Sequence, residues 1–133
     1  MKAGDTVITF EECGEMLDDI VDEMPSELFR DLNGGVILLP QSKIHPAAVD
    51  NDLFILGEYR RDNLGKYIAI FYGSISRIYG NLPKDKIRYH LTRIMHHEVR
   101  HHNEYLAGCD DLVVYDKQQI NSYLERKQQE NQN

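Results

Sequence analysis

The spacing of apolar side chains predicts a helix near the start of the chain. From Phe10 to Met24 apolar positions recur with the period of an α-helix, and the positions between them are mostly acidic. Thr9 and Glu12 have the spacing of a capping box, in which each side chain bonds to the backbone of the other residue. Pro25 either ends this helix or opens a second, short one.

Three short apolar runs in the middle of the chain predict β-strands. Val36–Leu39 is the first, and Leu53–Arg60 and Lys66–Tyr72 flank a loop that contains a glycine. That arrangement is typical of a β-hairpin. Residues 41–52 have no clear period and predict a loop, whereas residues 74–79 fit either a helical turn or a continuation of the strand.

The most regular helical pattern begins near Asn81 and ends before Gly108, and no glycine or proline interrupts it after Pro83. A final helix is expected from Asp116 to about Lys127. The Gln/Asn-rich residues 128–133 are expected to fray. Together these elements predict one α+β domain over residues 1–133, in which a small mixed sheet packs against the long helix.

The composition is that of an ordinary globular domain, with 41% apolar and 28% charged residues. The net charge of −7 results from 22 acidic and 15 basic side chains. A surface of this sign repels phosphate backbones, so we expect no nucleic-acid partner. The alternative is a local basic site, because four basic residues fall close together, namely Lys84, Lys86, Arg88 and Arg93.

The chain carries two cysteines, Cys13 and Cys109, outside any Cys-x-x-Cys spacing. Its first residues lack the apolar core of a secretory signal, and no segment is long and apolar enough to span a bilayer. We therefore expect a cytoplasmic protein with reduced thiols and no membrane partner.

Residues His97 to His101 form an H-E-x-x-H motif within the long predicted helix. Side chains four residues apart lie one above the other on a helix, so both imidazoles can face one cation. Glu98 can then reach a water on the metal without binding the metal itself, and serve as general base. We expect one Zn²⁺ per chain, and the alternative is a solvated charged face without a metal.

The third metal ligand has several candidates. On a helical wheel His90, His97, His101 and Glu104 occupy a strip roughly 60° wide beside the apolar stripe. Glu104 is the preferred ligand because the helix is unbroken up to Gly108. A turn after Gly108 could instead bring one of three acids to the metal, namely Asp110, Asp111 or Asp116. His90 is expected to line the cleft and His102 to be buried behind the ligands.

The motif, extended by His102 to H-E-x-x-H-H, resembles the small bacterial zincin-like metallopeptidase family once catalogued as a domain of unknown function. Leu56–Tyr59, Tyr67–Ser74 and the acidic N-terminal helix also resemble this family. Many members have a glycine and an aspartate where this chain has Glu104 and Ala107, which leaves the third ligand open. The resemblance implies a compact α+β fold with a small sheet over the metal-bearing helix.

The predicted function is zinc-dependent hydrolysis of a peptide or related amide bond in a peptide or protein substrate. Lys66–Ser74 is the expected edge strand for an extended substrate. Tyr59, Tyr67 and Tyr72 are candidates to stabilise an oxyanion. One alternative is a metal-binding regulatory or interaction module without activity. The other, a metal-dependent ribonuclease, is disfavoured by the acidic surface.

Overall fold

Helices and short strands make up most of the chain in the computed structural model, which describes residues 7–63, 65–108 and 111–131. The fold is α+β, as predicted. In chain order the elements are α1 (Phe10–Glu23), the 3-10 helix η2 (Ser26–Phe29), β1 (Gly35–Leu39), β2 (Lys43–Ile44), β3 (Phe54–Ile55), β4 (Gly57–Asp62), β5 (Gly65–Phe71), α2 (Tyr72–Tyr79), α3 (Lys84–Ala107) and α4 (Asp111–Asn131).

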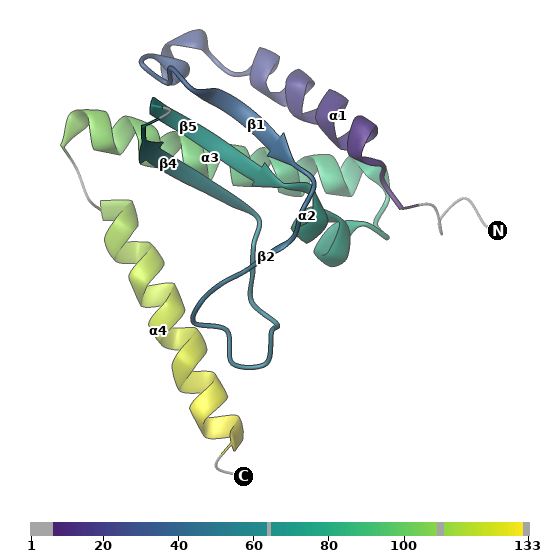
Figure 1. The fold of residues 1–133 in the computed structure, drawn as a ribbon, viewed down its shortest axis with the longest axis vertical. Helices are drawn as coiled ribbons and strands as arrows, with labels where there is room; N and C mark the ends of the chain where they lie inside the picture. Colours follow the sequence, from purple (N-terminus) through teal and green to yellow (C-terminus); the bar gives the residue numbers. More distant parts are fainter. Residues whose placement is uncertain (1–6, 64, 109–110, 132–133) are drawn as a thin grey trace.

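β5 is the central strand of a three-stranded mixed sheet (Figure 1). β1 pairs with it in parallel, with Gly35 opposite Tyr67, and β4 pairs with it antiparallel, with Gly57 opposite Ile70. The mixed sheet is therefore confirmed. The prediction that Lys66–Ser74 forms an edge strand is wrong, because β1 and β4 occupy both sides of β5. The edge strand that packs against α3 is β4.

The predicted strand Leu53–Arg60 is divided into two elements. Its first part, β3, pairs antiparallel with β2 in a separate two-stranded sheet, and β2 lies within the segment 41–52 that was predicted to be a loop. Its second part is β4. Residues 74–79, which fitted either a helical turn or a strand, belong to α2.

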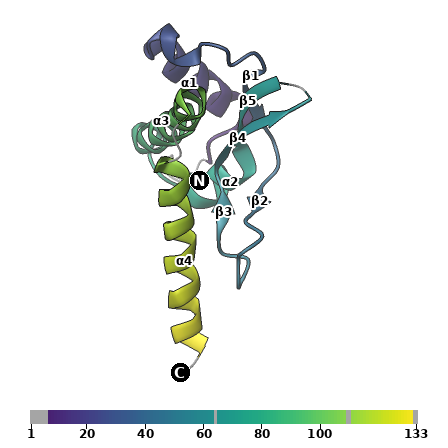
Figure 2. The same ribbon diagram turned by 90° about the vertical axis from the view of Figure 1, so that its left-hand side faces the viewer.

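Helices α1 and α3 cover one face of the three-stranded sheet (Figure 2). Leu17 and Ile20 of α1, Ile68 and Ile70 of β5, and Leu91 of α3 are buried together in the core between them. The predicted capping box starts α1, with Thr9 Oγ1 accepting from the Glu12 N–H at 3.0 Å and Glu12 Oε1 accepting from the Thr9 N–H at 2.9 Å.

The two C-terminal helices meet around Gly108, which has a left-handed φ of 76° at the end of α3. α4 is longer at both ends than predicted. Residues 128–131, which were expected to fray, are helical, and residues 132–133 lie outside the described part. Most of α4 extends away from the sheet and the other helices (Figure 1). Among the described residues, no helix has the length and apolar character of a bilayer span.

Candidate metal centre

His97 and His101 lie one turn apart on α3, with ring centroids 5.0 Å apart. The helix is fixed by buried apolar residues on its other side, among them Leu91, Met95 and Val99. The two imidazoles therefore project from a firmly packed helix onto the side that faces α4. The sequence prediction that both histidines face a common point is confirmed.

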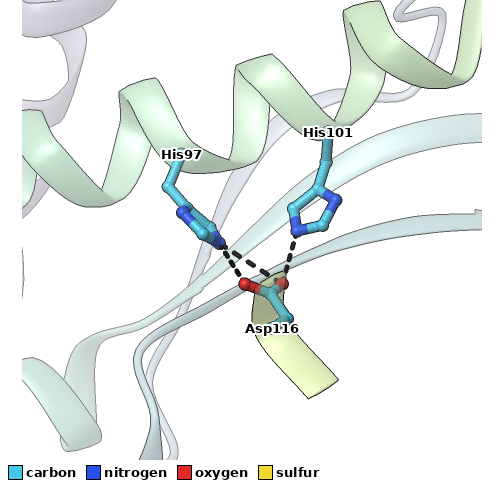
Figure 3. Close-up of side chains that lie close together, drawn as sticks. All are labelled: His97, His101 and Asp116. Carbon is cyan, nitrogen blue, oxygen red and sulfur yellow. Dashed lines mark hydrogen bonds and ion pairs between the residues drawn. The ribbon is translucent and has the colours of Figure 1, made fainter. Parts of the chain in front are cut away.

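Asp116 of α4 and the two histidines form a compact group that could hold a metal ion, the metal-binding group (Figure 3). Its Oδ2 atom lies 2.7 Å from His101 Nε2, and its Oδ1 atom lies 3.2 Å from His97 Nε2. Within the described residues, these three side chains form the one set of potential metal ligands whose atoms all lie within 4.8 Å of one another.

Glu104, which the helical pattern favoured as the third ligand, is not in this group. Its carboxylate accepts a hydrogen bond from Arg100 Nε at 2.6 Å, one turn back on the same helix. Asp116, one of the alternatives, takes the place expected for the third ligand, because α4 brings its carboxylate next to the two histidines. Asp110 and the side chain of Asp111 lie outside the described part of the chain.

The donor set fits a zinc ion. Zinc takes imidazole nitrogens and carboxylate oxygens at about 2.0–2.2 Å, which puts neighbouring ligand atoms of a tetrahedral site roughly 3.3 Å apart. From one carboxylate oxygen, Asp116 Oδ2, the distance to His97 Nε2 is 3.4 Å, which already has this size, and the distance to His101 Nε2 is 2.7 Å, which would have to lengthen. Three protein ligands would leave one position for water or substrate, as catalytic zinc sites do.

Glu98 is buried beside the metal-binding group, with 7% of its surface exposed. Burial, and after it the negative charge of Asp116, raise the pKa of this carboxyl group from its ordinary 4.5 to about 8. A backbone hydrogen bond from Tyr59, on β4, opposes both effects on the pKa. The carboxyl group thus lies between the edge strand and the histidines.

The absence of a side chain at Gly57 allows β4 to lie this close to α3. A Cβ atom at residue 57 would approach Ile70 Cδ1 and Ile94 Cγ2 to 3.0 Å and Glu98 Cγ to 3.4 Å. A larger residue would push the edge strand away from Glu98. The sequence identified Gly57 only as part of a resemblance, since its packing role depends on two elements distant in sequence.

His102 is fully buried and bonded at both ring nitrogens, as expected for a residue behind the ligands. Its Nε2–H donates to the Arg30 carbonyl at 2.6 Å, so Nδ1 is the acceptor for the Tyr59 hydroxyl at 2.7 Å. The ring therefore links α3 to β4 and to the segment after η2. Because both of its ring nitrogens are bonded elsewhere, His102 is not part of the metal-binding group, to which α3 contributes His97 and His101.

A cavity of about 600 Å³ extends from the metal-binding group between α3, α4 and β3. His97, Glu98 and Asp116 line one part of it. His90 also lines it, as predicted, with its ring stacked on Tyr79 at a centroid distance of 4.1 Å. The remaining wall is largely apolar, with Phe54, Ile55, Leu56, Ile94 and Ile120.

Fold and site together define a small α+β protein with a His-Glu-His motif on its central helix and an aspartate from the next helix. The chain is 31% identical to a conserved hypothetical protein from T. thermophilus, over 75% of this chain and 98% of that one, with a TM-score of 0.65. It belongs to the same family as that protein. No family model and no curated protein matches the chain.

Proposed function

We propose that this protein is a zinc-dependent, zincin-like metallopeptidase that hydrolyses a peptide or related amide bond. The observation that carries the proposal is the position of Glu98, buried in the same cavity as His97 and Asp116. His97, His101 and Asp116 would hold the metal. When bound, Zn²⁺ supplies Lewis acidity, which lowers the pKa of a coordinated water and polarises a carbonyl.

Glu98 would act as general base and then as general acid. Its carboxylate takes a proton from the attacking water and returns it to the amide nitrogen as the C–N bond breaks. This role requires the ionised form, which burial and Asp116 disfavour. A divalent cation held by the neighbouring residues favours the ionised form and so opposes that shift.

The free edge of β4 offers a place for the substrate backbone. The Phe71 N–H donates to the Leu56 carbonyl at 3.0 Å, so residues 56, 58, 60 and 62 direct their backbone groups to β5. The backbone groups of Gly57, Tyr59 and Arg61 therefore point to the opposite side, where the Tyr59 N–H bonds to Glu98. An extended peptide can add to such an edge with little dependence on side chains.

The test is hydrolysis of a mixed peptide library by zinc-loaded protein, together with the zinc content per chain. We expect about one zinc per wild-type chain. Glu98→Gln should keep the zinc and lose at least about 100-fold in rate, because the attacking water loses its base. Glu104→Gln, which changes another carboxylate on α3, is the matched control and should retain activity.

Zinc-loaded wild type that cleaves no peptide would contradict the proposal and support a metal-binding regulatory module. Equal activity of the Glu98→Gln variant would assign the base to another residue.

A further inference from the structure

His45 adjoins the candidate metal centre from outside the H-E-x-x-H helix. It directly follows β2, in a segment whose sequence pattern singled out no functional residue. It lines three cavities to which Asp116 also contributes. One of them contains His97 and Glu98, a second contains His101, and a third contains Glu98 and His101. No α3 residue outside the H-E-x-x-H motif lines all three of these cavities.

The loop that carries His45 fixes both its backbone and its ring. The His45 N–H donates to the Leu53 carbonyl at 2.8 Å, and its own carbonyl accepts from the Ala48 N–H at 2.9 Å. Ring atom Nδ1 accepts from the Ala47 N–H at 3.0 Å. A nitrogen that accepts carries no proton, so in the neutral ring the proton is on Nε2. Within the described residues, no protein group bonds to Nε2.

His45 is not a member of the metal-binding group, which among the described residues consists of His97, His101 and Asp116. A fixed N–H donor beside that group, with no acceptor among the described residues, is suited to a substrate oxygen. We propose that His45 Nε2–H stabilises the oxyanion that forms on the substrate carbonyl during hydrolysis. This inference rests on the proposed peptidase function.

The tyrosines considered for this role have other hydrogen-bond partners. The Tyr59 hydroxyl donates to His102 Nδ1 at 2.7 Å, the Tyr67 hydroxyl to Asp62 at 2.8 Å, and the Tyr72 hydroxyl to the Ile8 carbonyl at 2.5 Å. Each of these donors would have to break a bond inside the protein before it reached a substrate. His45 needs no such change.

The chemical step creates the charge that this donor would stabilise. The water oxygen forms a bond to the carbonyl carbon, and the π electron pair of the C=O bond moves onto the carbonyl oxygen. Glu98 takes the water proton, while the Nε2 proton stays on His45. When the C–N bond breaks, the electron pair returns from the oxygen and Glu98 delivers its proton to the nitrogen. His45 thus lowers the barrier without being consumed or changed.

Two substitutions separate the effect of the His45 N–H donor from the effect of the size of its ring. His45→Phe keeps a planar ring and removes the donor, whereas His45→Gln keeps an N–H donor on a flexible side chain. Removing one oxyanion donor costs about 10²- to 10³-fold in kcat in well-studied enzymes. We expect a loss of this size for His45→Phe, a smaller loss for His45→Gln, and in both variants a KM and a zinc affinity within about threefold of wild type. His90→Gln, in the same cavity, is the control and should change kcat little.

A second measurement does not require turnover. A short peptide phosphonate, in which a tetrahedral anionic phosphorus group replaces the scissile amide, is titrated calorimetrically into the zinc-loaded proteins. His45→Phe should weaken its binding at least about tenfold relative to wild type, and His90→Gln should not. If wild type holds zinc but cleaves no peptide, the proposed function fails, and this titration still decides whether His45 serves an oxyanion.

Three results would overturn the assignment. One is unchanged kcat and phosphonate affinity in His45→Phe. Another is a loss of zinc in both His45 variants as severe as in His97→Ala, which would make His45 a ligand. The third is an equal loss of kcat in His90→Gln, which would show a general disturbance of the cavity.

Discussion

The two helices that supply the candidate metal centre are held in place by different kinds of contact. α3 buries Ile87, Leu91, Met95 and Val99 in the main core and carries both histidines. On α4, Tyr123 is the one buried residue among the side chains that are described, and Asp116 retains 40% of its side-chain surface exposed. Core packing therefore positions the imidazoles, whereas the aspartate depends on a largely exposed helix.

The polar contacts of α4 reach the loop that begins with His45. The Tyr123 hydroxyl donates to Asp52 at 2.7 Å and accepts from the Val49 N–H at 2.9 Å. Lys127 Nζ pairs with Asp50 at 3.0 Å and with Asp52 at 2.5 Å. The comparison indicates that Asp116 can be altered without loss of the core. It also indicates that α4, which carries Asp116, is linked by these contacts to the loop that carries His45.

The largest effect is expected for the carboxyl group that α3 buries. In metal-free protein the pKa of Glu98 is about 8, against 4.5 in an unfolded chain. Between these pH values the unfolded chain releases a proton that the folded chain keeps, so the free energy of unfolding falls as pH rises and the full cost is present above about pH 8. At 1.36 kcal/mol per pKa unit, the cost is about 3–5 kcal/mol.

Glu98→Gln cannot titrate and should lack this loss of stability. Urea unfolding in the presence of EDTA at pH 5 and pH 8.5 measures it. Asp116→Asn removes the second cause of the pKa shift and should relieve part of it. Parallel pH profiles for wild type and Glu98→Gln would mean that α3 does not hold a destabilised carboxyl group.

The next effect sharpens the contrast between the helices. Asp116→Ala should weaken zinc binding more than about 100-fold, because loss of a residue that only supports a ligand already costs about 10- to 100-fold. At pH 5, where the folded protein keeps Glu98 protonated, unfolding of the metal-free protein should change little, since Asp116 lies on an exposed helix. Competition with a chelator of known affinity gives the zinc Kd, and Glu104→Ala should shift it less than about tenfold. A larger loss of zinc affinity in Glu104→Ala than in Asp116→Ala would instead assign Glu104 as the third ligand.

The smallest effect concerns the anchors of α4. Tyr123→Phe removes the hydroxyl that joins α4 to Asp52 and Val49, and Lys127→Met removes the ion pairs with Asp50 and Asp52. Each should weaken zinc binding by up to about tenfold, as expected for groups that support a ligand indirectly. Tyr115→Phe, at an exposed position of the same helix, is the control. Zinc affinities equal to wild type would show that Asp116 is positioned without this loop.

The sequence predicted those features that depend on neighbouring residues. The capping box at Thr9, the long helix up to Gly108 and the alignment of His97 with His101 all follow from local spacing. The preference for Glu104 did not anticipate the group that the described residues form, because the helical wheel contains no other helix. Arg100 engages Glu104 within α3, and Asp116 reaches the histidines only through the crossing of α4.

The strand order depended on contacts between distant parts of the chain. The hairpin pattern predicted that β4 and β5 are adjacent, but nothing in it indicated that β1 occupies the other side of β5. The sequence likewise did not predict the proposed role of His45. A histidine in a segment without periodicity gives no local signal, and its relation to Asp116 appears only after β2 and β3 have paired.

The parallel pairing of β1 with β5 has a consequence for the order of folding. It joins residue 35 to residue 67, and the loop that it closes contains β2, β3, β4 and His45. Closing a long loop costs chain entropy before its contacts form, so such pairings form slowly, whereas helices and hairpins form early. In pulsed hydrogen exchange during refolding, the amides of α3 should become protected first. The amides that bond β1 to β5 should become protected later, because their pairing closes the long loop.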